Sequence, residues 1–239
     1  MIVTSQVPAP VVVTDLPLPV TASELMRFGR FRDQRDSTRR AVETLVADNL
    51  HLVQPALLYS WVLVDGGTGG IVLHTGSPSS RVSLTMGCAG DFLRRAERVL
   101  AALYTVGPAL EEKARQLAAA GRAFDAYLMQ LLGLVALARI ENTVRTVVER
   151  EAAMYRWGTG PLLSPGSVHG WGLEQQGVFC SLLPLEQIGV RIGAEGVLQP
   201  FNSISCCIPV GPSYTDSQVR SSCDLCSGNR TCQYRQQVH

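Results

Sequence analysis

The stretch that decides the fold is residues 154–211, which read MYRWGTGPLLSPGSVHGWGLEQQGVFCSLLPLEQIGVRIGAEGVLQPFNSISCCIPVG. Its first part contains the run Leu163-Ser164-Pro165-Gly166-Ser167, which predicts a tight turn because proline fixes φ and glycine tolerates positive φ. Two serines and His169 stand at this turn, so polar groups gather there. A short helix is predicted to follow over residues 172–183.

The second part of the stretch alternates roughly between polar and apolar residues from Ile188 to Val210. This pattern predicts two or three short strands, with turns at residues 193–196 and 200–202, where glycine, proline and asparagine occur. The elements predicted upstream are a hairpin (56–65 and 71–74), a helix (91–98), a strand (99–106) and a helix that opens at Pro108.

A long helix is predicted from about Ala123 to Tyr155 by its spacing of apolar residues. One stripe on this helix has steps of three and four and consists of Leu134, Leu137, Glu141, Val144 and Val148. Glu141 places a carboxylate within the apolar stripe, where burial without a partner is costly. Two interpretations follow: Glu141 is a functional group of a pocket, or it pairs with Arg145 one turn away.

The composition favours a soluble cytoplasmic protein. The chain has 239 residues, of which 46% are hydrophobic and 17% charged, with a net charge of +1. This balance gives no electrostatic reason to expect nucleic acid or an anionic membrane as a partner. The arginines of residues 27–40 interleave with acidic residues, which predicts a solvated helix face. The longest apolar run, residues 126–138, falls short of the ~20 residues that span a bilayer, and the N-terminus lacks the basic region of a signal peptide.

The cysteines predict a metal centre. Three of the seven form the tail pattern Cys223-x2-Cys226-x5-Cys232, and Cys206 and Cys207 lie on the preceding predicted strand. With Cys207 as the fourth ligand, this spacing predicts a four-thiolate site for Zn²⁺ or a [4Fe–4S] cluster. A closed four-ligand site favours a structural role over a catalytic one. The alternatives are free surface thiols or an exposed redox pair.

Several short pieces follow one another in a recognisable order. They are Ser164-Pro165-Gly166, Trp171 with Leu173–Gln176, Ile188–Val190, Pro200, Ser203–Ser205 and Gly211, with fainter matches upstream at Leu84–Cys88, Thr105–Gly107 and the helix holding Glu141. This ordered series resembles the activation (reactivation) domain of cobalamin-dependent methionine synthase, chiefly its stand-alone relatives, over most of the chain. The resemblance implies an α+β fold with a central antiparallel sheet flanked by helices. It places that domain at residues 1–212 and a Cys-rich C-terminal tail, packed on it, at residues 213–239.

The chain departs from the family at the ligand-binding motif. The family binds S-adenosylmethionine with Arg-x-x-x-Gly-Tyr at this turn, and here the three positions hold Leu162, Gly166 and Ser167. An arginine can pair with the ligand carboxylate through two charge-assisted bonds, whereas leucine can make neither. The family's Thr-Glu-Ser segment corresponds here to Gly193-Ala194-Glu195.

The resemblance implies a small-molecule site for S-adenosylmethionine, used in corrinoid and methyl-transfer chemistry with a corrinoid protein as partner. In the family a helix glutamate near the position of Glu141 contacts the ligand amino group, so the expected pocket lies between Glu141, residues 163–167 and His169. The candidate acid–base groups are Glu141 and His169, and the candidate cofactor-binding residues are Ser164, Pro165, Gly166, Ser167 and Trp171. His169 could instead be a surface residue, and Trp171 a core residue.

Two other functions are consistent with the same residues. The chain could be an enzyme of a biosynthetic pathway with a repurposed pocket, or a non-enzymatic zinc or iron–sulfur partner subunit. Whether it is an enzyme stays open at this point.

Overall fold

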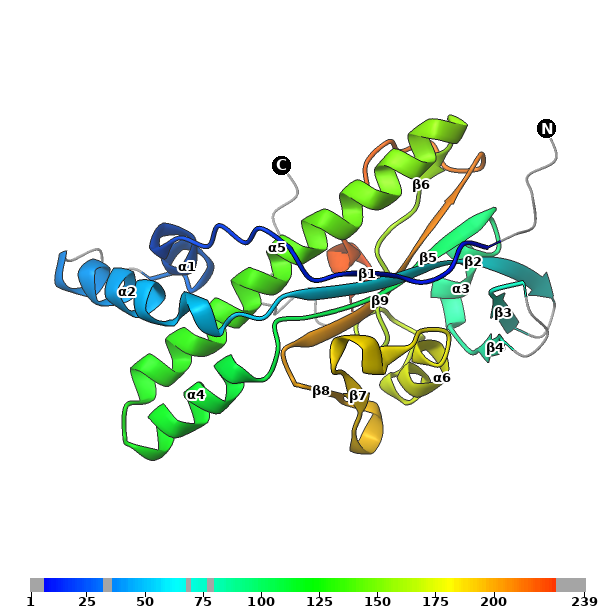
Figure 1. Ribbon diagram of the computed structural model, residues 1–239. Coiled ribbons are helices and arrows are strands. Elements are labelled where there is room, and N and C mark those ends of the chain that lie inside the picture. Colours follow the sequence, from blue (N-terminus) through cyan, green and yellow to red (C-terminus); the bar gives the residue numbers. More distant parts are fainter. Residues whose placement is uncertain (1–6, 32–35, 68–69, 77–79, 227–239) are drawn as a thin grey trace.

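An antiparallel sheet runs through the centre of the molecule (Figure 1). The computed structural model describes residues 7–31, 36–67, 70–76 and 80–226. Among these residues seven strands form the sheet: β1 (Val11–Val13), β2 (Ala56–Gly67), β3 (Gly70–His74), β4 (Arg81–Leu84), β5 (Arg98–Thr105), β6 (Gly158–Thr159) and β9 (Ser203–Gly211). The order is β4-β3-β2-β5-β9-β6, and β1 pairs with β2 as an additional edge. The predicted hairpin and the predicted extended strands are confirmed.

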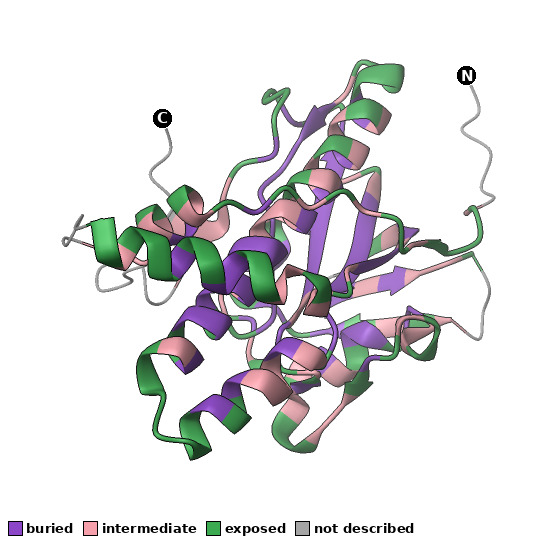
Figure 2. Ribbon diagram, turned by 60° about the vertical axis from the view of Figure 1, so that its left-hand side comes forward, coloured by how far each residue is buried: buried purple, intermediate pink, exposed green. Residues whose placement is uncertain are grey.

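Strand β5 lies between β2 and β9, and it is buried on both faces because a hydrophobic core packs against each face of the sheet. Alternate residues point to opposite sides of a strand. Leu100, Ala102 and Tyr104 belong to one apolar core, and Val99, Ala101 and Leu103 belong to the other. Figure 2 shows the central strands as the buried part of the fold. The two cores therefore meet along this strand.

Four helices cover the first face of the sheet: α1 (Ala22–Phe28), α2 (Asp36–Asn49), α4 (Ala109–Ala119) and α5 (Ala123–Tyr155). The predicted bounds of the long helix are those of α5. Thr21 caps α1 with a capping box, in which its hydroxyl accepts from the Glu24 N–H and the Glu24 carboxylate accepts from the Thr21 N–H. Glu141 belongs to α5 in this helix layer.

The second face is covered by short helices and turns, chiefly α3 (Gly90–Leu93), α6 (Gln176–Cys180), β7 (Arg191–Ile192) and β8 (Leu198–Gln199). The predicted turns around Gly193–Gly196 and Pro200–Asn202 separate β7, β8 and β9 as expected. Two predicted helices are too long. The helix at 172–183 is reduced to a 3-10 turn and α6, and the helix at 91–98 ends at Leu93, because the Glu97 N–H bonds to the Val210 carbonyl of β9.

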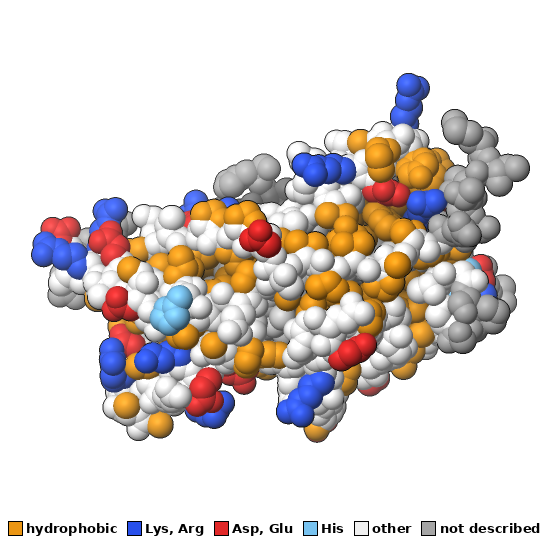
Figure 3. All heavy atoms as spheres, viewed as in Figure 1, with side chains coloured by type: hydrophobic (Ala, Val, Ile, Leu, Met, Phe, Trp, Pro, Cys, Tyr) orange, Lys and Arg blue, Asp and Glu red, His pale blue; other side chains and the backbone are white. Residues whose placement is uncertain are grey.

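Charged side chains of both signs gather at the end of the molecule that carries α2 and α4 (Figure 3). Several form ion pairs: Arg39 with Glu43 at 3.1 Å, and Arg139 of α5 with Glu24 of α1. Because opposite charges neutralise one another here, the arginines of residues 27–40 that the structure describes make no single-sign surface. The expectation of a solvated helix face fits this arrangement.

One helix in the described part of the chain, α5, is long and apolar enough to cross a bilayer by length and composition. Its most apolar window has a mean hydropathy of 1.5, and 56% of that window is buried inside the molecule. Leu128, Leu132, Ala136 and Ile140 are buried against the first core. The apolar character of α5 is thus used in packing the helix layer.

Candidate functional site

A cleft opens beside the long helix, and we name it the Glu141 cleft. It has a volume of ≈ 370 Å³, and its lining includes Glu141, Leu162, Ser164, Pro165, Ser167, Gln176, Phe201, Ser203, Ser205 and Ser222. Residues 141, 164 and 203 come from α5, a loop and β9, which are far apart in the sequence. The sequence-based expectation that Glu141 faces the turn at residues 163–167 is met by this shared lining.

The cleft lies at an edge of the sheet. Strand β6 pairs only with Val210 and Gly211 of β9, and a single bridge joins Leu163 to Cys207. Within the described residues, positions 203–206 therefore have no strand along their outer edge. The helix layer and the loop layer face each other across this gap.

Glu141 is held by two partners from different elements. Its Oε1 accepts hydrogen bonds from Arg145 Nη2 at 2.6 Å and Nε at 3.0 Å, and its Oε2 accepts from the Tyr104 hydroxyl of β5 at 3.2 Å. The side chains of Glu141 and Arg145 are each 16% exposed. The pairing with Arg145 at one helical turn is as the second interpretation expected. Glu141 also lines the cleft, and a functional role for it stays a prediction.

Tyr104 stays a neutral hydrogen-bond donor in this network. Burial raises the pKa of Tyr104 well above its ordinary value, and the negative charge of Glu141 raises that pKa further. The phenol therefore keeps its proton across the physiological range and orients the Glu141 carboxylate. Cys206 lies on the same face of the sheet, and burial raises the pKa of its thiol well above the ordinary value.

Arg145 also ties the C-terminal segment to the helix. Its Nη1 donates to the Val219 carbonyl at 2.5 Å, while the Val219 N–H donates to Glu149 Oε1 at 2.9 Å. These bonds hold residues 219–222 along α5 and bring Ser222 to the cleft. Val219 is thus held against α5, while the division into a domain at residues 1–212 and a Cys-rich tail at residues 213–239 stays a prediction.

The turn at residues 163–167 presents side chains to the cleft, and the N–H groups of Leu163, Gly166 and Ser167 are used in hydrogen bonds within the protein. The Leu163 N–H and carbonyl bond to Cys207 at 2.9 and 2.8 Å, which anchors the turn on β9. The N–H groups of Gly166, Ser167 and Val168 bond to carbonyls at Trp171 and Ser164. The hydroxyls of Ser164 and Ser167 are therefore available to a ligand as donors.

Serine hydroxyls are the main polar groups of the cleft. In the described part of the chain, those of Ser164, Ser167 and Ser222 have no hydrogen-bond partner in the protein. Ser205 donates to Gln176 Oε1 at 3.0 Å, and Ser203 donates to the Thr105 hydroxyl at 2.9 Å. Ser203, Ser205 and Ser222 were not predicted as site residues from the sequence. The two-residue spacing of Ser203 and Ser205 places both side chains on one face of β9.

Three residues singled out in the sequence do not line the cleft. His169 is exposed, and its backbone N–H and carbonyl contact Leu225 and the Cys88 thiol. Trp171 is 1% exposed and packs edge-to-face on Phe179 in the second core. Gly166 forms the turn with φ of 75°. The pocket expected between Glu141, the turn and His169 is thus lined by Glu141 and the turn, with His169 outside.

Leu162, at the position of the family arginine, has a packing role in this chain. Its side chain is 4% exposed in the first core, and its N–H donates to the Arg220 carbonyl at 3.0 Å. The lining of the cleft contains no arginine among the described residues, and Glu141 is its ionisable side chain. A ligand carboxylate would therefore have to be bound by hydroxyl groups.

The predicted metal ligands are not assembled in the described part of the chain. No group of three or more histidine, cysteine, aspartate or glutamate side chains there is arranged to hold a metal ion. Cys207 is fully buried in the second core, Cys223 and Cys226 are half-buried, and Cys232 lies outside the described residues. Cys207 is thus not gathered with Cys223 and Cys226, and the four-thiolate site stays a prediction.

The sheet, the helix layer and the cleft define the class: an α+β fold of mixed helices and antiparallel sheet, like that of methionine synthase reactivation domains. Among solved structures, the crystal structure of the MetH reactivation domain bound to AdoHcy matches with a TM-score of 0.58. The match has 12% sequence identity and covers 87% of this chain and 81% of that chain, so it shows a shared fold. No family model and no curated protein matches the sequence.

Proposed function

We propose that this protein binds an adenosyl-type small molecule, of the S-adenosylmethionine class, in the Glu141 cleft. The observation that supports this proposal most directly is that Glu141 and three residues of the turn, Ser164, Pro165 and Ser167, line one open cleft. Support comes from the shared fold with a domain whose crystal structure contains AdoHcy. The burial of α5 supports a soluble protein, and we keep the cytoplasm as its expected location.

The charge of the cleft suits a ligand with a cationic group. Glu141 is negative and faces the cleft, while its partner Arg145 is directed at the carboxylate and at the Val219 carbonyl. A ligand ammonium or sulfonium group can approach the free lone pairs of the carboxylate. The sugar hydroxyls and carboxylate of such a ligand would be left to the serine side chains.

The proposed setting is corrinoid-dependent methyl transfer, in which the protein would hold the methyl donor for a corrinoid protein. In that setting the corrinoid supplies the methyl-accepting chemistry, and the chain supplies binding and orientation. Phe201, which is 71% exposed at the rim of the cleft, would lie close to such a partner.

The first test is calorimetry with S-adenosylmethionine, S-adenosylhomocysteine and 5′-methylthioadenosine. We expect all three to bind, with 5′-methylthioadenosine the weakest, because it lacks both the ammonium group that would approach Glu141 and the carboxylate that is left to the serine hydroxyls. Glu141→Gln should weaken S-adenosylmethionine binding about tenfold, the range of one charge-assisted hydrogen bond.

A matched control is Glu151→Gln. Glu151 lies on the same helix, pairs with Arg98 at 3.0 Å and has a 17% exposed side chain, but it does not line the cleft. Its substitution should leave affinity unchanged. If folded protein gives no binding heat at millimolar concentrations of all three ligands, the proposal is refuted. If Glu141→Gln and Glu151→Gln lose affinity equally, Glu141 does not contact the ligand.

A further inference from the structure

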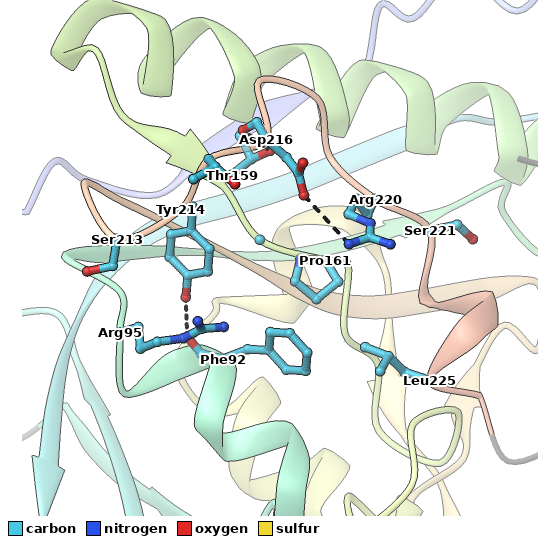
Figure 4. Close-up of a pocket in the computed structure, with 12 residues that line it drawn as sticks. Phe92, Arg95, Thr159, Pro161, Ser213, Tyr214, Asp216, Arg220, Ser221 and Leu225 are labelled. Carbon is cyan, nitrogen blue, oxygen red and sulfur yellow. Dashed lines mark hydrogen bonds and ion pairs between the residues drawn. The ribbon is translucent and has the colours of Figure 1, made fainter. Parts of the chain in front are cut away.

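A second cavity lies between the α3 region and the C-terminal segment (Figure 4). It has a volume of ≈ 200 Å³, which is enough for a small organic molecule, and it shares no lining residue with the Glu141 cleft. We name it the Arg95–Arg220 cavity after the two arginines in its wall. Phe92, Pro161 and Leu225 supply apolar surface to the wall of this cavity.

Tight packing around Tyr214 fixes the shape of this cavity. The Tyr214 hydroxyl donates to the Phe92 carbonyl, which joins the C-terminal segment to α3. A Cβ on Gly160 would meet Pro209 at 2.6 Å and the Tyr214 ring at 2.9 Å, and a Cβ on Gly158 would meet the Tyr214 carbonyl oxygen at 2.3 Å. The Tyr214 ring can therefore lie where it does because Gly160 has no side chain, and the Tyr214 backbone because Gly158 has none.

The two guanidinium groups of the cavity are incompletely neutralised. Arg95 lies over the rings of Phe92 and Tyr214, with its Cζ 5.8 and 5.5 Å from their centroids. No carboxylate of the described residues lies within ion-pair distance of Arg95. Arg220 has one ion pair, a 3.8 Å approach to Asp216, and its side chain is 66% exposed.

The charge count selects a monoanion. Arg95 and Arg220 contribute two positive charges and Asp216 one negative charge, so the ionisable lining carries +1. A ligand with one negative charge balances this lining, whereas a dianionic phosphate would place excess negative charge beside Asp216 and against Phe92 and Leu225. An apolar group on the ligand would be buried on the hydrophobic side.

We propose that the Arg95–Arg220 cavity binds a small organic monocarboxylate. Arg95 and Arg220 supply the positive charge and the paired N–H donors that suit a carboxylate. The apolar part of the ligand packs on Phe92, Pro161 and Leu225, and the Ser221 hydroxyl is within the same wall. This site is separate from the proposed adenosyl site, and neither proposal depends on the other.

The test is a calorimetric titration of the full chain with phenylacetate as the probe, alongside neutral 2-phenylacetamide and inorganic phosphate. We expect phenylacetate to bind at least tenfold more tightly than either of the others. Arg220→Gln and Arg95→Gln should each lower its affinity about tenfold, as loss of a charge-assisted bond predicts. Asp216→Asn should raise the affinity, because it removes a repelling charge and releases Arg220.

Arg94→Gln is the matched control, since Arg94 neighbours Arg95 but pairs with Asp91 and lies outside the cavity lining. It should leave binding unchanged. The melting temperature of each variant shows whether it is folded. Equal binding of phenylacetate and 2-phenylacetamide, tighter binding of phosphate, no binding at millimolar phenylacetate, or an affinity unmoved by Asp216→Asn and both arginine variants would each overturn the proposal.

Discussion

The hydroxyl of Tyr104, on the central strand, donates a 3.2 Å hydrogen bond to the carboxylate of Glu141 on the long helix. This bond joins the fully buried middle of the sheet to the wall of an open cleft. The orientation of the Glu141 carboxylate is therefore set by the core of the protein as well as by its neighbour Arg145.

Tyr104→Phe is expected to lower the free energy of unfolding by about 1 kcal/mol, the net value of one hydrogen bond when water can reach the acceptor. Denaturant unfolding monitored by circular dichroism measures this loss. Tyr127→Phe, at an exposed ring on the same helix as Glu141, should stay within about 0.5 kcal/mol of the parent. A larger loss at Tyr127 than at Tyr104 would contradict the network.

Stability should fall at alkaline pH because several buried groups keep their protons only in the folded state. Burial raises the pKa values of Cys206, Cys207 and Tyr104, and raises those of Cys180 and Tyr214 to about 12. The unfolded chain releases these protons first, so their contribution is complete below about pH 8.5 and is lost as the pH rises toward the folded values. Each group can contribute a slope of up to about 1.4 kcal/mol per pH unit in this window.

Denaturant unfolding at pH 8, 9, 10 and 11 tests that expectation. Tyr104→Phe should flatten the decline above pH 10, where the unfolded phenol titrates. Stability that is constant from pH 8 to 11 would show that these groups are not protected as the fold indicates.

Two glycines, Gly160 beside β6 and Gly177 on α6, differ in the space around them. Gly160→Ala is expected to destabilise by about 1–3 kcal/mol, since the added methyl group overlaps Pro209 and the Tyr214 ring. Gly177→Ala, on α6, adds a methyl group with nothing within 4 Å and should stabilise by about 0.5–1 kcal/mol. Thermal unfolding of both variants checks the opposite signs, and a stable Gly160→Ala protein would mean that Tyr214 can move.

Thiol labelling separates the cysteines by burial. Cys180, Cys206 and Cys207 are buried with raised pKa values, which leaves four of the seven able to react in the folded protein at pH 8. Intact-mass analysis should find at most four labels, and seven after unfolding. If the tail cysteines hold a metal ion, a chelator will raise the number of labelled cysteines in the folded protein from one to four. An unchanged number of labels after chelation would count against the metal site.

Much of the fold follows from local signals in the sequence. The turns around Gly193 and Pro200 divide the chain into the strands that the alternating pattern indicates, and α5 has the predicted bounds. Local propensity fails where tertiary pairing competes with it. Residues 94–98 have no strong helix breaker, yet the bond from Glu97 to Val210 draws that segment to the sheet.

The site was predictable only in part because its residues are distant along the chain. Glu141 was identifiable as a carboxylate on an apolar stripe, and Ser164, Pro165 and Ser167 from the turn. Ser222 reaches the cleft through the bonds of Val219 to Arg145 and Glu149, which no local pattern reveals. His169 is adjacent to the turn in sequence, but the chain reverses there and leaves it outside the cleft.

Consecutive residues of two segments face different cavities: Pro161 and Ser221 line one, and Leu162 and Ser222 line the other. The partition between the two cavities is thus a pair of segments, outside the named strands, that are joined by the bridge from Pro161 to Arg220. A shift of its backbone moves both walls at once. If a ligand bound in one cavity shifts this backbone, the affinity of the other cavity for its own ligand changes. By thermodynamic linkage, the second ligand then changes the affinity for the first by the same factor.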